Sequence, residues 1–207
     1  MTIKAVFFDF GGVILEHADG IDHKAIEARL GLEERTLFHC MYMESRYRDF
    51  QVGGCTEEEW LESIRAAAVA RIGPERAEEL MEAWQSAERP LNKEMLALIE
   101  RLRAADYKTG IISNTTPKFE ERLQEAAPHL IPMFDVRVGS GDVKLAKPDP
   151  GIFHHAMREL GVEPEASVFT DDVRAYAEAA TALGMRGFHF QGYERFAEDL
   201  RSIGVDV

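Results

Sequence analysis

Four short segments of the sequence carry residue types that can do chemistry together, and three of them directly follow an apolar run. In the first, Asp9 is followed by Gly11 and Gly12. Glycines let the backbone turn sharply and bring its N–H groups close to an anion. In the second, Ser113 and Asn114 offer a hydroxyl and an amide that can donate hydrogen bonds to a phosphoryl oxygen. Together the two segments are typical of a site for an anionic substrate.

The other two segments carry charge. Lys147 stands before Pro148 at the start of a predicted helix and offers a fixed cation. Asp171 and Asp172 are adjacent acids after an apolar run, and they would repel each other without a cation nearby. They could serve instead as an N-cap for the next helix. Because Mg²⁺ favours oxygen-rich sites, we interpret the pair as metal ligands.

The elements that must position these segments follow from the periodicity of the chain. From Leu91 onward, short apolar runs alternate with longer amphipathic stretches, which is typical of strand and helix units packed as a parallel sheet. The predicted strands cover residues 3–8, 108–113, about 134–138, 167–170 and 186–190. Each of these strands runs into a polar residue at its C-terminal end, where open α/β sheets bind ligands. The sequence therefore predicts an α/β fold with a ligand site at that edge of the sheet.

A stretch of about seventy residues without a convincing strand separates the first two predicted strands, which is too long for an ordinary loop. Its pattern predicts helices over residues 22–30, 33–48, 56–72 and 74–88. Thr56 and Glu59 have the spacing of a capping box at the start of the third helix. We therefore expect a core of residues 1–16 and 89–207, with a helical domain of residues 17–88 inserted in it. Arg46 and Arg48 of this insertion could recognise a substrate anion or simply be solvated.

In these four motifs, taken in order, the chain resembles the haloacid dehalogenase (HAD) superfamily of hydrolases, in a branch with a D-x-G-G-V opening. The helical insertion after the first motif is similar to the cap domain of that superfamily. The resemblance implies a Rossmann-like parallel sheet core and an active site that holds Mg²⁺. The implied ligands are Asp9, the backbone carbonyl of Gly11, Asp172 directly, and Asp171 either directly or through water.

The resemblance also implies a mechanism in which Asp9 and Lys147 are catalytic. A phosphate ester dianion repels an attacking carboxylate, so Mg²⁺ and a lysine must neutralise the phosphoryl oxygens before Asp9 can approach in line. Asp9 would then form an aspartyl-phosphate that water hydrolyses. Ser113, Asn114 and Gly12 would bind and orient the phosphoryl group. We therefore expect a phosphatase that acts on a small phosphorylated metabolite.

The chain departs from the pattern of the superfamily at two positions. Most HAD phosphatases carry a second Asp two positions after the nucleophile, where this chain has Gly11. Losing such an acid/base typically lowers the rate about a hundredfold to ten-thousandfold. Tyr176 stands where relatives often carry Asn or Asp, so this position offers no carboxylate or amide to support the metal. Two alternatives therefore stay open: a metal-independent 2-haloacid dehalogenase, and a catalytically impaired binding protein of the same fold.

The composition limits the kinds of molecule that the protein is expected to bind. With 24 basic and 37 acidic residues, the formal net charge is −13, which argues against nucleic acid or an anionic membrane surface as the main partner. Cys40 and Cys55 cannot support a disulfide framework, and no stretch is apolar enough for a signal peptide or a membrane span. We expect a cytoplasmic enzyme, monomeric or dimeric, that takes a small phosphorylated substrate.

Overall fold

The computed structural model describes residues 2–17 and 21–206 of the 207-residue chain. In this part of the chain the strands form one five-stranded parallel sheet with the order β3-β2-β1-β4-β5. The strands are β1 (Ala5–Phe8), β2 (Lys108–Ser113), β3 (Val136–Gly139), β4 (Ser167–Asp171) and β5 (Arg186–His189). All five predicted strands are confirmed, with ends that differ by one or two residues. The α/β fold predicted from the sequence is therefore correct.

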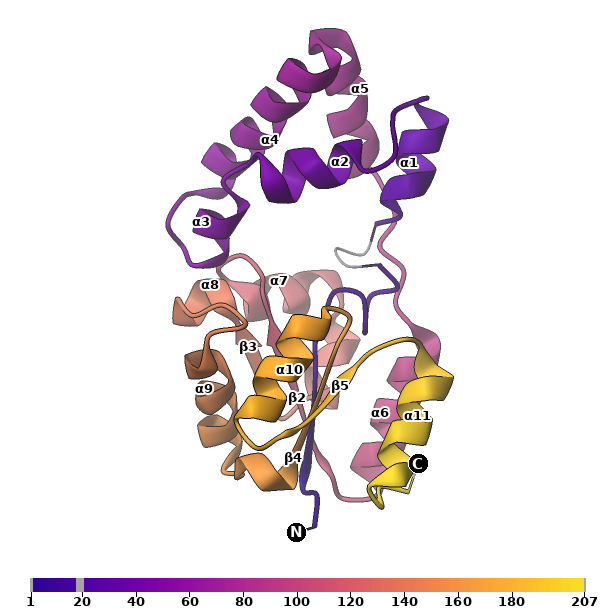
Figure 1. Cartoon of the computed structure of the whole chain (residues 1–207), viewed down its shortest axis with the longest axis vertical. Helices are drawn as coiled ribbons and strands as arrows, with labels where there is room; N and C mark the ends of the chain where they lie inside the picture. The colour runs from indigo at the N-terminus through magenta and orange to yellow at the C-terminus, as the bar shows by residue number, and fades with distance from the viewer. Residues whose placement is uncertain (1, 18–20, 207) are drawn as a thin grey trace.

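The central strand β1 is apolar along its whole length because both of its faces are buried. Val6 and Phe8 belong to the hydrophobic cluster on one face of the sheet, and Ala5 and Phe7 belong to the cluster on the other. The first cluster includes side chains of α6 (Lys93–Ala104), α7 (Phe119–Ala126) and α11 (Tyr193–Ser202). The second includes side chains of α9 (Pro150–Leu160) and α10 (Arg174–Ala182). The core thus has three layers, with helices on both faces of the sheet (Figure 1).

Short elements complete the connections between these layers. They are η2 (Pro128–Met133), α8 (Ser140–Val143) and η3 (Pro164–Ala166). Of these, α8 directly follows β3 and lies at the end of the sheet that faces the helical insertion (Figure 1). No helix in residues 2–17 and 21–206 is long and apolar enough to cross a lipid bilayer.

The chain between β1 and α6 folds into helices, as its sequence predicts, and they lie together beyond the C-terminal ends of the strands (Figure 1). They are α1 (His23–Arg29), α2 (Thr36–Phe38), the π-helical turn η1 (His39–Met43), α3 (Tyr47–Gln51), α4 (Glu57–Ile72) and α5 (Pro74–Gln85). Their buried apolar side chains form a hydrophobic cluster of their own, whose members all lie between Ile21 and Trp84. The insertion therefore has a core separate from the two clusters that cover the sheet.

The single helix predicted over residues 33–48 is wrong, because the structure divides this segment into α2, η1 and α3. The Ser45 hydroxyl donates back to the Met41 carbonyl, and the Arg46 N–H donates to Ser63 Oγ at 2.9 Å. Both bonds draw polar groups of the segment away from a regular helical ladder. The capping box predicted at the start of α4 is confirmed, since Glu59 N donates to Thr56 Oγ1 and Thr56 N donates to Glu59 Oε2.

Two connections hold the insertion to the core. Where the chain leaves the core and returns to it, Leu15 and Leu91 form an antiparallel bridge. This bridge lies just outside the predicted limits of the insertion at residues 17 and 88; residues 18–20, at its predicted start, lie outside the described part of the chain. On the opposite side, the Ser140 hydroxyl of α8 lies 2.7 Å from the carbonyl oxygen of Gln51 at the end of α3. The insertion is therefore hydrogen-bonded to the core on two opposite sides.

Candidate active site

Three neighbouring strands bring the predicted acids and the predicted serine to one edge of the sheet. Because β1 lies between β2 and β4, and all three are parallel, their C-terminal ends meet. Asp9 directly follows β1, Ser113 ends β2 and Asp171 ends β4. The Asp9 N–H donates to the Thr170 carbonyl at 2.9 Å, which extends the pairing of β1 with β4 and fixes the backbone that carries the carboxylate.

The ammonium group of Lys147 lies at the centre of this cluster. Its Nζ is 2.9 Å from Asp9 Oδ1 and 2.5 Å from Asp171 Oδ2. The side chains of Lys147 and Asp171 are fully buried, whereas that of Asp9 is 11% exposed. Burial alone would lower the pKa of Lys147, but the charges of Asp9 and Asp171 outweigh burial and raise it. Lys147 therefore remains a cation between two carboxylates.

Two aromatic rings also contact this ammonium. Nζ of Lys147 lies 5.3 Å from the ring centroid of Phe169 and 5.2 Å from that of Tyr176, which is within the range of a cation–π interaction. Tyr176 is one of the two positions at which the sequence departs from the superfamily pattern. In the structure its ring stabilises the positive charge of the lysine, a contact that no motif in the sequence indicates.

Asn114 holds the backbone of Lys147 in place. Its Oδ1 accepts from the Lys147 N–H at 2.7 Å, and its Nδ2 donates to the Lys147 carbonyl at 2.9 Å. The same Nδ2 is 3.4 Å from the Tyr176 hydroxyl. Both ends of the amide are thus bonded to the protein, and the predicted contact of this side chain with a phosphoryl group stays a prediction. The sequence gives no signal for this pairing, because the partners are 33 positions apart.

The three acids of the site lie close enough to share one cation. Asp9, Asp171 and Asp172 each offer an oxygen, and these oxygens lie within 4.8 Å of one another. Burial, and then the charge of Asp9, raise the pKa of Asp171 to about 7 and that of Asp172 to about 6. Three carboxylates with one lysine leave negative charge unbalanced. A cluster of hard oxygen donors with excess negative charge fits a divalent cation such as Mg²⁺.

Gly12 is required by the turn that follows Asp9. Its φ is +76°, and a Cβ at this position would lie 2.5 Å from the carboxyl carbon of Asp172. Only glycine lets the backbone pass this close to the acid in this conformation. The Gly12 N–H donates to the carbonyl of His17 at 2.9 Å, so its predicted role in phosphate binding stays a prediction. Gly11 before it lines the cavity beside the site.

A cavity of about 620 Å³ adjoins the site and lies between the core and the insertion. Gly11, Ser113 and Asn114 line it from the core, and Trp60 and Trp84 line it from the insertion. A molecule that reaches the carboxylates through this cavity therefore contacts both parts of the chain.

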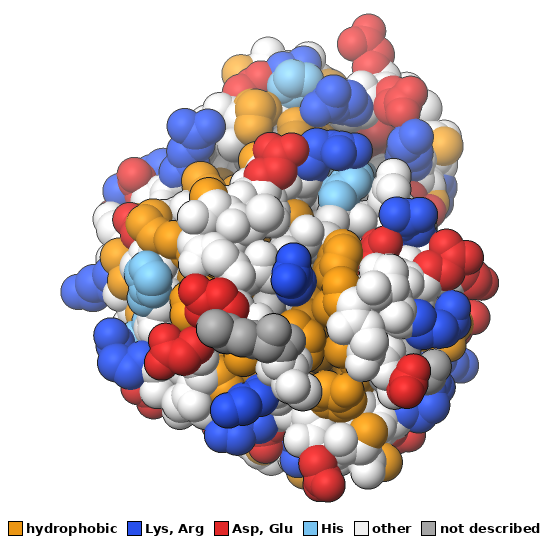
Figure 2. Space-filling view, turned by 60° about the horizontal axis from the view of Figure 1, so that its bottom comes forward, with side chains coloured by type: hydrophobic (Ala, Val, Ile, Leu, Met, Phe, Trp, Pro, Cys, Tyr) orange, Lys and Arg blue, Asp and Glu red, His pale blue; other side chains and the backbone are white. Residues whose placement is uncertain are grey.

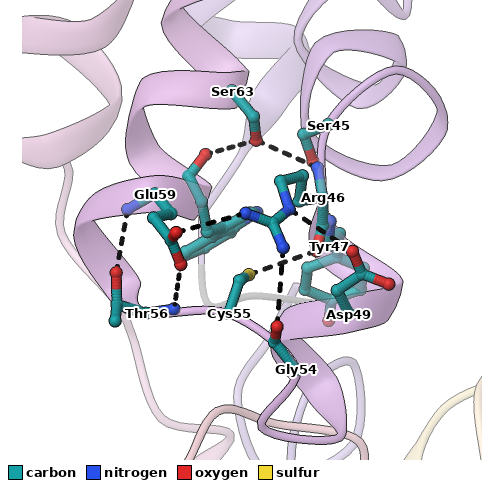
Figure 3. Close-up of polar contacts among 10 residues, drawn as sticks. Ser45, Arg46, Tyr47, Asp49, Gly54, Cys55, Thr56, Glu59 and Ser63 are labelled. Carbon is teal, nitrogen blue, oxygen red and sulfur yellow. Dashed lines mark hydrogen bonds and ion pairs between the residues drawn. The ribbon is translucent and has the colours of Figure 1, made fainter.

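The structure places Arg46 away from this cavity and within a network of the insertion (Figure 3). Its guanidinium lies 3.3 Å from Asp49 Oδ2, 3.4 Å from the Gly54 carbonyl and 3.5 Å from Glu59 Oε1. These contacts tie the loop after α3 to the first turn of α4. Arg48 does not line the cavity either. The arginines that do are Arg89 and Arg122, which the sequence does not single out.

The fold and the site together define an α/β protein with a Rossmann-like parallel sheet and a carboxylate and lysine centre at the ends of its strands. The chain matches the haloacid dehalogenase-like hydrolases over residues 3–184, so it belongs to this family and is an enzyme. Phosphatase MT3486 of Mycobacterium tuberculosis is 26% identical to it, over 99% of this chain and 97% of that protein. Phosphoserine phosphatase of Thermus thermophilus is 30% identical over 82% of this chain, which spans 65% of that relative.

A solved structure with the same fold comes from Bacteroides thetaiotaomicron. The HAD family enzyme BT-2542 superposes with a TM-score of 0.70 at 22% identity, over 96% of this chain and 98% of that one. Another structure of that enzyme is a complex with magnesium and inorganic phosphate, and it superposes with a TM-score of 0.68. The likeness extends over the insertion as well as the sheet.

Proposed function

We propose that the protein is a Mg²⁺-dependent phosphatase that hydrolyses a small phosphorylated metabolite through an aspartyl-phosphate on Asp9. The observation that carries this proposal is the arrangement of Asp9, Asp171 and Asp172 within 4.8 Å around the Lys147 ammonium, beside a cavity. The phosphatases among its relatives, and the magnesium and phosphate in the Bacteroides enzyme, support it.

Asp9 is the nucleophile in this proposal. Its Oδ1 accepts from the Phe10 N–H at 2.7 Å and from Lys147 at 2.9 Å, which holds the carboxylate in one orientation. We infer that Oδ2 attacks the phosphorus and that the bond to the leaving oxygen breaks, giving an acyl phosphate on Asp9 and an alkoxide that takes a proton from solvent. Water then attacks this phosphorus and loses a proton to solvent, the bond from phosphorus to Asp9 Oδ2 breaks, and inorganic phosphate leaves with the carboxylate restored. Lys147 neutralises the phosphoryl oxygens during both steps.

Mg²⁺ would be held by Asp9, the backbone carbonyl of Gly11 and Asp172, with Asp171 as a fourth ligand that binds either directly or through a water. Asp171 already accepts from Lys147 and from the Val173 N–H at 2.8 Å, so Asp172 is the freer of the two acids. When bound, the ion supplies positive charge that stabilises the phosphoryl oxygens in the transition state. Ser113 and Gly12 would help to orient the phosphoryl group, and Asn114 would do so while holding Lys147.

We also propose that residues 17–88 act as a cap domain over a core of residues 1–16 and 89–207, as in the D-x-G-G-V branch of the superfamily. The separate hydrophobic cluster of the insertion and the Leu15–Leu91 bridge support these limits. Cys40 and Cys55 are both free thiols, as expected of a cytoplasmic protein. The expected oligomeric state, monomer or dimer, stays a prediction.

The proposal is tested by phosphate release from a panel of phosphorylated metabolites, with Mg²⁺ and with EDTA. We expect release that needs Mg²⁺ and that falls by at least a thousandfold in Asp9→Asn. Because Gly11 provides no acid, we expect slow turnover of esters with poor leaving groups. Chloride release from 2-haloacids that persists in EDTA would instead establish the dehalogenase alternative. Binding of Mg²⁺ and phosphate without turnover of any substrate would point to the impaired binding protein.

A further inference from the structure

The cavity beside the active site is much larger than a phosphoryl group requires. At about 620 Å³ it falls in the range of roughly 300 to 1,000 Å³ found for sites that enclose whole organic ligands. Phosphate with a two- or three-carbon fragment would leave most of this space to water. The shape and chemistry of the walls therefore carry information about the organic part of the substrate.

The walls are rich in aromatic side chains from both parts of the chain. Six of them line the cavity: Phe10, Tyr42, Tyr47, Trp60, Trp84 and Phe119. On the core side, the rings of Phe10 and Phe119 pack edge to face with centroids 5.5 Å apart. On the insertion side, Trp60 contacts Tyr47 at 5.8 Å and Trp84 at 5.9 Å. A polyhydroxylated ligand would lose hydrogen bonds to water against such walls, whereas a flat ring would gain aromatic contacts.

Of the two arginines that line the cavity, Arg122 is the more buried, and it has no ion pair among the described residues. Arg122 of α7 is half-buried, and its Nη2 donates to Thr115 Oγ1 and to the Thr116 carbonyl, each at 3.0 Å. Burial lowers the pKa of this guanidinium, and the more distant charges of Glu57 and Asp142 oppose that effect without a direct contact. Its Nε–H also has no acceptor in the described part of the chain. Arg89, the other arginine of the cavity, is exposed and therefore solvated.

We propose that the substrate is an aromatic phosphomonoester whose flat ring lies between the two aromatic walls and whose carboxylate or carbonyl oxygen accepts from Arg122. The inference rests on the proposed phosphatase function and names the substrate class of the same site. A phosphate whose organic part carries no oxygen acceptor would add no hydrogen bond to the Arg122 guanidinium, whose Nε–H has no acceptor among the described residues. A small polar phosphate would leave the aromatic walls in contact with water. A ring that carries an oxygen acceptor satisfies both features.

The first test measures binding and does not depend on turnover. The chain has two tryptophans, Trp60 and Trp84, and both line the cavity, so intrinsic fluorescence reports its occupation. The Asp9→Asn variant is titrated in Mg²⁺ with phenyl phosphate, with the three isomers of carboxyphenyl phosphate, and with glycerol 3-phosphate. We expect the aromatic esters to change the fluorescence at concentrations at least tenfold lower than glycerol 3-phosphate. Equal affinities for the aromatic and aliphatic esters would overturn the inference.

The second test isolates the role of Arg122. One carboxyphenyl isomer is expected to bind about tenfold more tightly than phenyl phosphate, because a charge-assisted hydrogen bond to the guanidinium is stronger than a contact with water. In Arg122→Met the ratio of the two affinities should fall to about one. Arg158→Met, a change to an arginine of α9 outside the cavity, is the matched control and should keep the original ratio. Circular dichroism and thermal unfolding confirm that each variant is folded, and Arg122→Gln repeats the test if Arg122→Met is not.

Different results would contradict the phosphatase activity and the aromatic ligand class. If the wild-type enzyme hydrolyses neither these esters nor any member of the metabolite panel, but Asp9→Asn still prefers the aromatic esters, the phosphatase proposal is wrong and the ligand class stands. If glycerol 3-phosphate is hydrolysed with a kcat/KM equal to that of the aromatic esters, the phosphatase proposal stands and the ligand class is wrong. If Arg122→Met still binds the carboxyphenyl phosphate about tenfold more tightly than phenyl phosphate, Arg122 does not bind the oxygen acceptor of the ligand.

Discussion

At the scale of single residues, Lys147 connects the two halves of the acid cluster. Replacing it by Met would leave Asp9 and Asp171 facing each other without a counter-charge in a buried site. Because removing one partner of a buried ion pair typically costs about 3 to 5 kcal/mol, we expect the free energy of unfolding in urea to fall by a similar amount. We also expect phosphate release to be lost, because no other cation contacts Asp9 among the described residues.

The matched control for this prediction is the neighbouring lysine. Lys144 is exposed on the loop that follows α8, and it makes no ion pair with the described residues. Lys144→Met should therefore change neither stability nor activity beyond about 0.5 kcal/mol. If Lys144→Met abolishes phosphate release and Lys147→Met does not, the assignment of the catalytic lysine is wrong.

Gly12 gives a second prediction at this scale. Gly12→Ala places a Cβ 2.5 Å from the carboxyl carbon of Asp172, so the acid must move. We expect Mg²⁺ affinity, measured by calorimetry, to fall at least tenfold. Gly161→Ala is the control, since Gly161 also has a positive φ of +67° but no atom lies within 4 Å of its added Cβ. That variant should lose about 1 kcal/mol of stability and bind Mg²⁺ normally. Equal effects of the two substitutions on Mg²⁺ affinity would contradict the argument.

At the scale of secondary structure, Ser140 of α8 links the insertion to the core. Its buried hydroxyl accepts from the Thr115 N–H at 2.9 Å and lies 2.7 Å from the Gln51 carbonyl. Removing it in Ser140→Ala should free the end of α3 from the core. We expect faster hydrogen exchange in residues 47–54 and a higher KM, because the insertion completes the wall of the cavity.

A buried serine in the opposite half of the sheet serves as the control for this prediction. Ser167 at the start of β4 also has a fully buried hydroxyl, and within the described part of the chain this hydroxyl donates only to the Glu163 carbonyl near the far end of the strands. Ser167→Ala should cost a similar amount of stability and leave exchange in α3 and KM unchanged. If both variants speed exchange in α3 alike, Ser140 has no special role as a link.

The sequence predicts these elements best where burial dictates residue type. All residues of β1 are apolar because both faces of the strand are covered, and the predicted strand therefore agrees with β1 to within two residues. The break in the predicted helix of residues 33–48 depends instead on Ser63 of α4, which takes the Arg46 N–H from 17 positions away. Neither the periodicity nor the composition of the sequence indicates a contact of this kind.

Some features of the site can likewise be predicted from the sequence, and others cannot. The strand ends that carry Asp9, Ser113 and Asp171 can be predicted, because parallel strands place them at one edge. The bonds from Asn114 to the Lys147 backbone and the position of Arg122 in the cavity wall arise from packing between distant segments. They become visible only once the chain is folded.

At the scale of the whole molecule, the net charge of −13 is not concentrated in the active site. On the face that Figure 2 shows, acidic and basic side chains are scattered among each other and no continuous basic area forms. The expectation that nucleic acid is not a partner stays a prediction. The acids that matter for the proposed function are the three that converge at the ends of β1 and β4, where their combined negative charge favours a bound cation.

The negative charge of the three acids predicts that bound Mg²⁺ stabilises the folded protein. A ligand that binds only the folded state stabilises it by about 2.7 kcal/mol at a hundredfold excess over its Kd. For a chain of this size such a gain corresponds to a rise in Tm of roughly 5 to 10 °C. We expect this rise by differential scanning calorimetry in Mg²⁺ relative to EDTA, and we expect Asp172→Asn to lose most of it. Asp206→Asn, which removes an exposed acid of the same charge, should keep the full rise. A rise of the same size in Asp172→Asn would show that the ion acts elsewhere on the acidic surface and not at the cluster.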